Sequence, residues 1–324
     1  MHPLIVSAIA GDVRALGKAL SEIEDGAIDI NELLVDISKE AGSKIGKSHV
    51  IRNAQVIGIT GPPGVGKSTT TGALITEYRK QNLRVAVLAV DPSSPVTGGA
   101  LLGDRIRMQE HALDEGVFIR SMSSRGQLGG LASATQAAAK VLDAVGFDIV
   151  IVETVGVGQS EVDVVNAVDT VVLVLAPGAG DGIQAAKAGI LEIADIYVVN
   201  KADRDGAEGV VRELRSMMGL GITDANSWSP EIVTTTAISG LGLADLVTAI
   251  SHHQTWAIGS GNRDLRIANR AKIGLRLAIL SALSNQLELR SGNLDALSAQ
   301  VAAGKITTEE AVKTILIELG ISKP

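Results

Sequence analysis

The sequence predicts an α/β fold with a mostly parallel central sheet flanked by helices, extended by further helices at both ends of the chain. Seven short apolar runs alternate with helical patterns between residues 51 and 256. These runs are continuously apolar, which is typical of parallel strands that are buried on both faces. They comprise Val56–Thr60, Val85–Val90, Val117–Met122, Ile149–Thr154, Val171–Ala176, Ile196–Val199 and Ile232–Thr236.

Both ends of the chain show helical periodicity. In the segment 1–50, Leu16, Leu20 and Ile23 are spaced as on one face of a helix. In the segment 257–324 a longer apolar stripe needs a partner surface, either the central part of the chain or a second copy. We expect a homodimer, with packing inside the chain as the alternative. The stripe comprises Ala268, Ala271, Leu275, Ile279, Leu283 and Leu287.

The first apolar run leads directly into a glycine-rich segment. Residues 61–68 read Gly-Pro-Pro-Gly-Val-Gly-Lys-Ser and fit the phosphate-loop pattern, with a strand before it and a helix after it. Backbone N–H groups of Gly64, Val65 and Gly66 would surround phosphate oxygens at the positive end of the following helix. Lys67 would reach the β- and γ-phosphates, and the Ser68 hydroxyl would bind Mg²⁺. The sequence therefore predicts a P-loop NTPase.

A second motif indicates which nucleotide is bound. Asn200-Lys201-Ala202-Asp203 follows the run Ile196–Val199. A carboxylate at Asp203 can accept hydrogen bonds from guanine N1–H and N2–H₂, whereas adenine offers no such donor pair. Thr235-Thr236-Ala237 resembles the short loop that completes a guanine pocket. We therefore expect Thr236 and Ala237 to contact the base, and the nucleotide to be GTP or GDP.

Acidic residues at strand ends are candidate magnesium ligands. In an α/β sheet the ligand lies beyond the carboxyl ends of the strands, where Asp91 and Glu153 stand. A helix cap or surface turn is the alternative for each. Asp104 lies in the loop region after Asp91 and is a third candidate, while a solvated surface charge is its alternative. Gly156, three residues after Glu153, is placed to sense the γ-phosphate.

The residue that orients the attacking water is less clearly marked. Val157 occupies the position after the sensing glycine where a glutamine is usual, and Gln159 is the nearest substitute. We therefore expect slow intrinsic hydrolysis that a partner accelerates. His252 and His253, near Trp256, have no other histidine or cysteine nearby in sequence. We assign them to a helix end instead of a metal site.

Composition excludes several other classes. The net charge is −7 and aromatic residues make up 2% of the chain, which argues against nucleic-acid binding. No cysteine is present, so disulfides and thiolate metal sites are excluded. The apolar runs are too short to span a bilayer. The apolar start of the chain lacks a basic region, so we expect no signal peptide and a cytoplasmic protein.

Taken together, these motifs resemble the methylmalonyl-CoA mutase-associated GTPases of the MeaB and ArgK type, which belong with the metallochaperone-type GTPases. The segments that carry the resemblance are GPPGVGKST, VLAVDPSSP, GALLGDRIRM, VETVGVGQSE, PGAGD and NKAD. The resemblance covers most of the chain. It implies an N-terminal helical segment (1–50), a P-loop GTPase domain (51–256) and a C-terminal helical dimerisation arm (257–324).

The resemblance also implies a biological role. Such proteins are homodimers that bind an adenosylcobalamin-dependent acyl-CoA mutase, gate the loading of its cofactor and help to remove damaged cofactor. By matching position, Lys67, Ser68 and Thr69 would hold phosphate, and Asn200, Lys201 and Asp203 would hold guanine. Ser68, Asp91, Asp104 and Glu153 would form the magnesium neighbourhood.

Two other enzyme classes stay open. A metal-insertion GTPase would fit the motifs, although such chains usually carry Cys-rich or His-rich sites. An ATP-dependent kinase or transport ATPase is suggested by an older name of the family. The Asn200–Asp203 motif argues against ATP.

Overall fold

The computed structural model describes residues 2–25, 27–28, 54–91, 109–111, 113–123, 130–154, 167–178, 191–219, 227–288, 291–318 and 320. The chain divides into two compact units, Met1–Arg270 and Ala271–Pro324. The predicted functional boundaries at residues 50 and 256 stay predictions.

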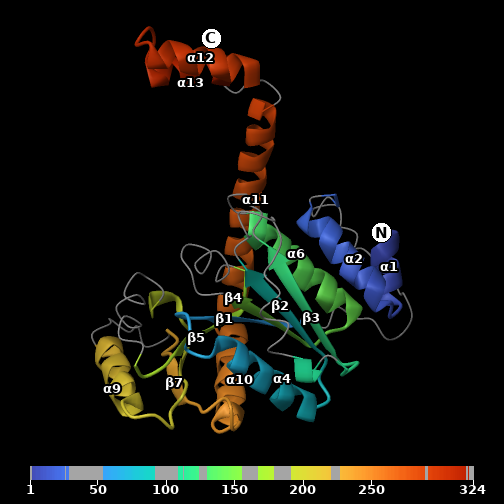
Figure 1. Ribbon diagram of the computed structural model, residues 1–324, viewed down its shortest axis with the longest axis vertical. Helices are drawn as coiled ribbons and strands as arrows, with labels where there is room; N and C mark the ends of the chain where they lie inside the picture. The colour runs from blue at the N-terminus through green and yellow to red at the C-terminus, as the bar shows by residue number, and fades with distance from the viewer. Residues whose placement is uncertain are drawn as a thin grey trace. The chain divides into compact units, whose positions relative to one another are not determined.

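The first unit is built on a seven-stranded sheet (Figure 1). The strand order is β3-β2-β4-β1-β5-β6-β7, and every neighbouring pair is parallel. Each predicted run forms a strand, so the α/β prediction is confirmed. The strands are β1 (Gln55–Thr60), β2 (Val85–Asp91), β3 (Val117–Ser123), β4 (Ile149–Thr154), β5 (Thr170–Leu175), β6 (Ile196–Val199) and β7 (Glu231–Thr234).

Strand β1 lies at the centre of the sheet between β4 and β5. Ile59 lies opposite Glu153 of β4, and Thr60 lies opposite Leu173 of β5. The segment that follows β1 therefore leaves the sheet beside the carboxyl ends of two neighbours. This is where an open α/β sheet binds its ligands.

Helices connect the strands and cover both faces of the sheet. The described helices are α1 (Pro3–Ile9), α2 (Val13–Glu24), α4 (Lys67–Lys80), α6 (Gly130–Val145), α9 (Ala207–Met218), α10 (Leu243–Gly259), α11 (Asn262–Glu288), α12 (Ser291–Ala302) and α13 (Thr308–Glu318). Two 3₁₀ turns, η1 (Gln109–His111) and η2 (Leu191–Ile193), lie between them.

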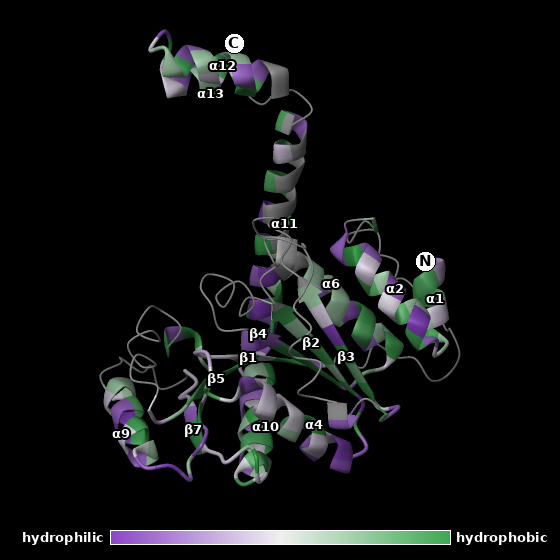
Figure 2. Cartoon of the chain, viewed as in Figure 1, coloured by the Kyte–Doolittle hydropathy of each residue, from purple (hydrophilic) through white to green (hydrophobic). Residues whose placement is uncertain are grey.

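The two faces of the sheet have separate cores. On one face, α1, α2 and α6 pack over residues such as Leu88 and Val152. On the other face, α4 and α10 pack over residues such as Ile57 and Val172. Successive strand residues point to opposite faces, so strands covered on both sides must be apolar throughout. Figure 2 shows this continuous hydrophobic character along the central strands.

The N-terminal helices belong to this packed unit. The carboxylate of Asp12 accepts hydrogen bonds from the N–H groups of Arg14 and Ala15 and caps α2. Leu16, Leu20 and Ile23 are buried, which confirms the helical face predicted from their spacing.

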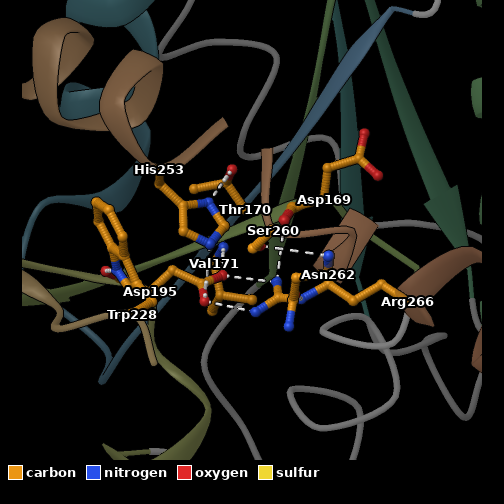
Figure 3. Close-up of polar contacts among 9 residues, drawn as sticks. All are labelled: Asp169, Thr170, Val171, Asp195, Trp228, His253, Ser260, Asn262 and Arg266. Atoms are coloured by element: carbon orange, nitrogen blue, oxygen red, sulfur yellow. Dashed lines mark hydrogen bonds and ion pairs between the residues drawn. The ribbon is translucent and has the colours of Figure 1, made fainter. Parts of the chain in front are cut away.

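A buried polar cluster lies where strands β5 and β6 begin, at the end of the sheet away from the carboxyl ends of the strands (Figure 3). Asp195, just before β6, accepts two hydrogen bonds from Arg266 of α11, at 2.8 and 2.6 Å, and one from the N–H of Val171. His253 of α10 places Nε2 3.2 Å from Oδ1 of Asp195, and its Nδ1 lies 2.8 Å from the Thr170 hydroxyl. This Asp195 cluster fastens the beginning of α11 to the sheet.

Burial and pairing act in opposite directions on Asp195. Burial opposes the charged carboxylate, but the close contact with His253 and the hydrogen bonds from Arg266 outweigh it and hold the pKa of Asp195 below its usual value. His253 is fully buried inside α10, with Trp228 and Trp256 around its ring. The prediction that His252 and His253 mark a helix end is therefore wrong, because α10 continues to Gly259.

The second unit holds the rest of α11 together with α12 and α13. Thr307 and Glu310 form a reciprocal capping box at the start of α13, in which each accepts the other's N–H. Leu275, Ile279 and Leu280 of α11 are exposed at 64%, 52% and 52%. No helix in the described part of the chain is both long enough and apolar enough to cross a membrane.

Candidate nucleotide-binding site

The loop between β1 and α4 is shaped by glycines. Gly61, Gly64 and Gly66 have φ values of 143°, 77° and 100°, in a region that other residues rarely adopt. A Cβ atom on Gly61 would lie 2.1 Å from the carbonyl oxygen of Val174. Helix α4 then begins at Lys67 without a side-chain cap on its first N–H groups. Uncapped N–H groups after a glycine loop form a cradle that fits phosphate.

Lys67 bends back over this loop. Its ammonium group donates to the carbonyl oxygens of Gly61 and Pro62, at 2.7 and 3.0 Å, and the residue is 7% exposed. A positive charge is thereby held beside the N–H groups of the loop. Thr69, the last predicted phosphate contact, is exposed on the first turn of α4.

The structure brings two of the predicted magnesium ligands together. The hydroxyl of Ser68 donates to Oε1 of Glu153 at 2.6 Å, although the two residues are 85 positions apart. Both are buried, at 7% and 4% exposed. A hydroxyl and a carboxylate at the phosphate loop are oxygen ligands of the kind that Mg²⁺ prefers, so the residues present fit the ion.

A third hydroxyl belongs to the same group and was missed by the sequence analysis. Thr71 donates to Oε2 of Glu153 at 2.8 Å and is fully buried. The available signal was its position three residues after Ser68, which places both side chains on one face of α4.

Asn200 connects the phosphate loop to the predicted guanine loop. Its amide nitrogen donates to the carbonyl oxygen of Val65 at 2.9 Å. Its amide oxygen accepts from the N–H of Ala237 and from the hydroxyl of Thr235, at 3.1 and 3.2 Å. Because Asn200 is 2% exposed and its side chain contacts both loops, it fixes their relative positions.

The rest of the predicted guanine contacts surround Asn200. Lys201 donates to the carbonyl oxygen of Gly64 at 2.6 Å. Asp203 is exposed in the following turn. Thr236 pairs with Leu241 in an isolated bridge, which closes the short loop that contains Ala237. The motifs at residues 61–68, 200–203 and 235–237 therefore meet at one edge of the sheet.

Several predicted site residues cannot be placed. Asp104, Gly156 and Gln159 lie outside the described residues. Asp91 is the last residue of β2, next to β4, but its side chain is also outside the description.

Similarity to known proteins extends over nearly the whole chain. A putative GTPase of Pyrococcus abyssi is 43% identical over 313 residues, which cover 95% of this chain and 94% of that protein. The mouse mitochondrial methylmalonic aciduria type A homolog is 40% identical over 211 residues, which cover 63% of this chain and 50% of that protein.

One solved structure matches the complete fold. A protein described as an LAO/AO transport system kinase superposes with a TM-score of 0.70 at 26% identity, covering 98% of this chain and 96% of its own. The family profile described as "Methylmalonyl Co-A mutase-associated GTPase MeaB" matches residues 16–291. This chain is therefore a P-loop GTPase that binds guanine nucleotide, and it belongs to the MeaB family of methylmalonyl-CoA mutase-associated GTPases.

Proposed function

We propose that this GTPase is a chaperone for an adenosylcobalamin-dependent acyl-CoA mutase such as methylmalonyl-CoA mutase. In this role it gates the loading of the cofactor and protects or reactivates the mutase, with the bound nucleotide as the signal. The observation that carries the proposal is the extent of the family match, from residue 16 in α2 to residue 291 in α12. The match includes helices beyond the sheet, whereas a shared phosphate loop alone would be restricted to its core.

Within this proposal each part of the site has a separate task. The N–H groups of residues 64–69 and the ammonium group of Lys67 bind the phosphates. Asp203 accepts hydrogen bonds from guanine, while Asn200 and Lys201 hold the base-binding turn against the phosphate loop. Thr236 and Ala237 close the base pocket, and Gly156 senses the γ-phosphate.

Magnesium completes the proposed site. Ser68, Glu153, Asp91 and Asp104 would hold the ion, which neutralises phosphate charge when it is bound. The contact between Ser68 and Glu153 supports this assignment. Gln159 would orient the attacking water, and Lys67 would stabilise the negative charge that develops on the phosphate.

We also propose that the protein is a cytoplasmic homodimer. The exposed side chains of Leu275, Ile279 and Leu280 on α11 support a second copy as the partner surface. Sedimentation of the wild-type chain and of a Leu275→Lys/Ile279→Lys variant tests the dimer. The wild type should sediment as a dimer and the variant as a monomer, while a monomeric wild type would contradict it.

An ATP-dependent kinase or transport ATPase is the second candidate, because the solved relative is described as a transport system kinase. Adenine has no N2 amino group to pair with Asp203, so we expect weak ATP turnover. A metal-insertion GTPase has no such support, since the described residues contain no group of three or more potential metal-ligating side chains.

The deciding experiment measures steady-state GTP hydrolysis with no addition, with apo-mutase and with holo-mutase, using ATP as a parallel substrate. We expect slow GTP hydrolysis that rises clearly with methylmalonyl-CoA mutase. A Lys67→Ala variant controls for contaminating nucleotidase activity and should show no mutase-dependent increase. Unchanged hydrolysis would contradict this mutase as the client, and preferred turnover of ATP would favour the second candidate.

A further inference from the structure

The first helical turns of α4 present two hydroxyl groups to one carboxylate. Ser68 donates to Oε1 of Glu153 at 2.6 Å, and Thr71 donates to Oε2 at 2.8 Å. The two donors are three residues apart, so they lie on the same face of the helix, one above the other. Each oxygen of the Glu153 carboxylate therefore has its own donor from α4.

The two hydroxyls differ in what else they can reach. Ser68 follows Lys67 at the start of the helix, where the phosphate loop ends. Thr71 is one turn further along, and its exposed fraction is zero. A hydroxyl has one proton to donate and lone pairs that can bind a cation. Ser68 lies beside the phosphate loop, so it can donate its proton to Glu153 and bind a cation through its lone pairs. Thr71 lies one turn further from that loop and is placed to donate to Glu153 alone.

A glutamate at this position needs such a restraint. Its side chain has one more rotatable bond than the aspartate that most GTPases carry there, so more carboxylate orientations are accessible. A hydrogen bond to Oε2 limits rotation about the last bond and keeps Oε1 directed at Ser68. In metal sites, partners that orient a ligand commonly change metal affinity when they are removed.

We propose, resting on the magnesium site of the proposed function, that Thr71 is a positioning residue for magnesium-dependent nucleotide binding. Its hydroxyl holds the Glu153 carboxylate in the orientation that the ion requires. Thr71 itself contacts neither the ion nor the nucleotide.

The test measures the dissociation rate of a fluorescent GDP analogue across a magnesium titration, with EDTA as the zero point. In Thr71→Val we expect the magnesium concentration for half-maximal retention to rise by about 10- to 100-fold. The EDTA rate should equal that of the wild type, because the phosphate loop is unchanged. Thr71→Ser restores the hydroxyl and should restore the wild-type requirement.

Two further variants keep the test decisive. Thr135→Val removes an equally buried hydroxyl on α6 that has no hydrogen bond among the described residues, and should leave the magnesium requirement unchanged. Thr71→Cys keeps a weak donor and should give an intermediate requirement, even if Thr71→Val does not fold.

Failure of the proposed magnesium site and failure of the role proposed for Thr71 would give different results. A wild-type rate that does not respond to magnesium would overturn the proposed magnesium site itself. A magnesium-dependent wild type together with an unchanged requirement in Thr71→Val, or in Thr71→Cys where Thr71→Val does not fold, would overturn the role of Thr71 alone. An equal EDTA rate combined with a raised requirement supports positioning, because a general loosening of α4 would change both.

Discussion

Two buried carboxylates lie at opposite edges of the sheet, and different donors stabilise them. Glu153, at the carboxyl end of β4, accepts hydrogen bonds from the hydroxyls of Ser68 and Thr71. Asp195, at the amino end of β6, accepts from the guanidinium of Arg266. A guanidinium brings a permanent positive charge and no acceptor, whereas a hydroxyl is neutral and keeps lone pairs for a cation.

The difference separates a structural carboxylate from one suited to ligand binding. The charge of Asp195 is balanced by a side chain of the fold itself, so its pairing is complete when the chain folds. The hydroxyl donors of Glu153 can be shared with a cation that arrives with the nucleotide. We therefore expect substitutions at Asp195 to change stability and substitutions at Glu153 to change nucleotide chemistry.

The largest expected effect is that of Asp195→Asn on stability. The change leaves Arg266 without its charged partner in a largely buried site, so the free energy of unfolding should fall by about 3–5 kcal/mol. Urea denaturation measures it, with Asp295→Asn on the exposed side of α12 as the matched control. A loss below about 1 kcal/mol would remove the structural role of Asp195.

Glu153→Gln should strongly reduce GTP hydrolysis and change stability little, the reverse of Asp195→Asn. The neutral amide weakens cation binding, and GTP turnover should fall on the order of 100-fold. The free energy of unfolding should change by about 1 kcal/mol, because the amide oxygen still accepts one hydroxyl. Single-turnover hydrolysis measures the effect, and Glu192→Gln in an exposed turn is the control. Full activity of Glu153→Gln would break the comparison.

The acid dependence of stability sharpens the comparison further. The pKa of Asp195 is held below its usual value, so its contribution to stability is present above the unfolded-state pKa of about 3.9. As the pH falls through the lower folded-state pKa, the carboxylate is protonated and this contribution is lost. At about pH 5 and above, the stability difference between the wild type and Asp195→Asn should therefore include the full contribution of the Asp195 charge.

Below about pH 4 that difference should narrow by up to about 1.4 kcal/mol per pH unit. Urea denaturation at a series of pH values measures it. A difference that stays constant into acid would mean that the charge of Asp195 is not what stabilises the cluster.

The smallest loss of stability is expected for the ion pair between Arg270 of α11 and Asp169. Arg270 donates to Asp169 at 2.7 Å in a partly exposed position. Arg270→Gln should lower the free energy of unfolding by about 1 kcal/mol, less than Arg266→Gln, because Arg270 donates one hydrogen bond to Asp169 whereas Arg266 donates two to the Asp195 carboxylate and one to a carbonyl oxygen. Thermal unfolding of the two variants compares them, and an equal or larger loss for Arg270→Gln would contradict the assigned order.

The parts of the fold that depend on local patterns were predictable from the sequence. A run such as Ile149–Thr154 indicates a doubly buried strand because its first four residues are all apolar, and the structure has it as β4. The contact between Ser68 and Glu153 was also predictable. Ser68 comes after the loop that follows β1, Glu153 lies at the carboxyl end of β4, and the carboxyl ends of parallel strands lie together.

Contacts that depend on distant segments were not predictable in this way. Asp195, His253 and Arg266 belong to no motif, and they meet only because β6, α10 and α11 converge at one edge of the sheet. Thr71 looked like an ordinary helix residue, since its partner is 82 positions away. The burial of His253 was not predictable either, because it depends on Asp195 and Trp228, which come from distant parts of the chain.

The most direct test of this account is the affinity for GDP, measured by calorimetry with and without magnesium, for the wild type, Glu153→Gln and Asp195→Asn. We predict that magnesium strengthens binding to the wild type and to Asp195→Asn equally, and has a much smaller effect on Glu153→Gln. An unchanged magnesium effect in Glu153→Gln, or its loss in folded Asp195→Asn, would contradict the division between the two edges of the sheet.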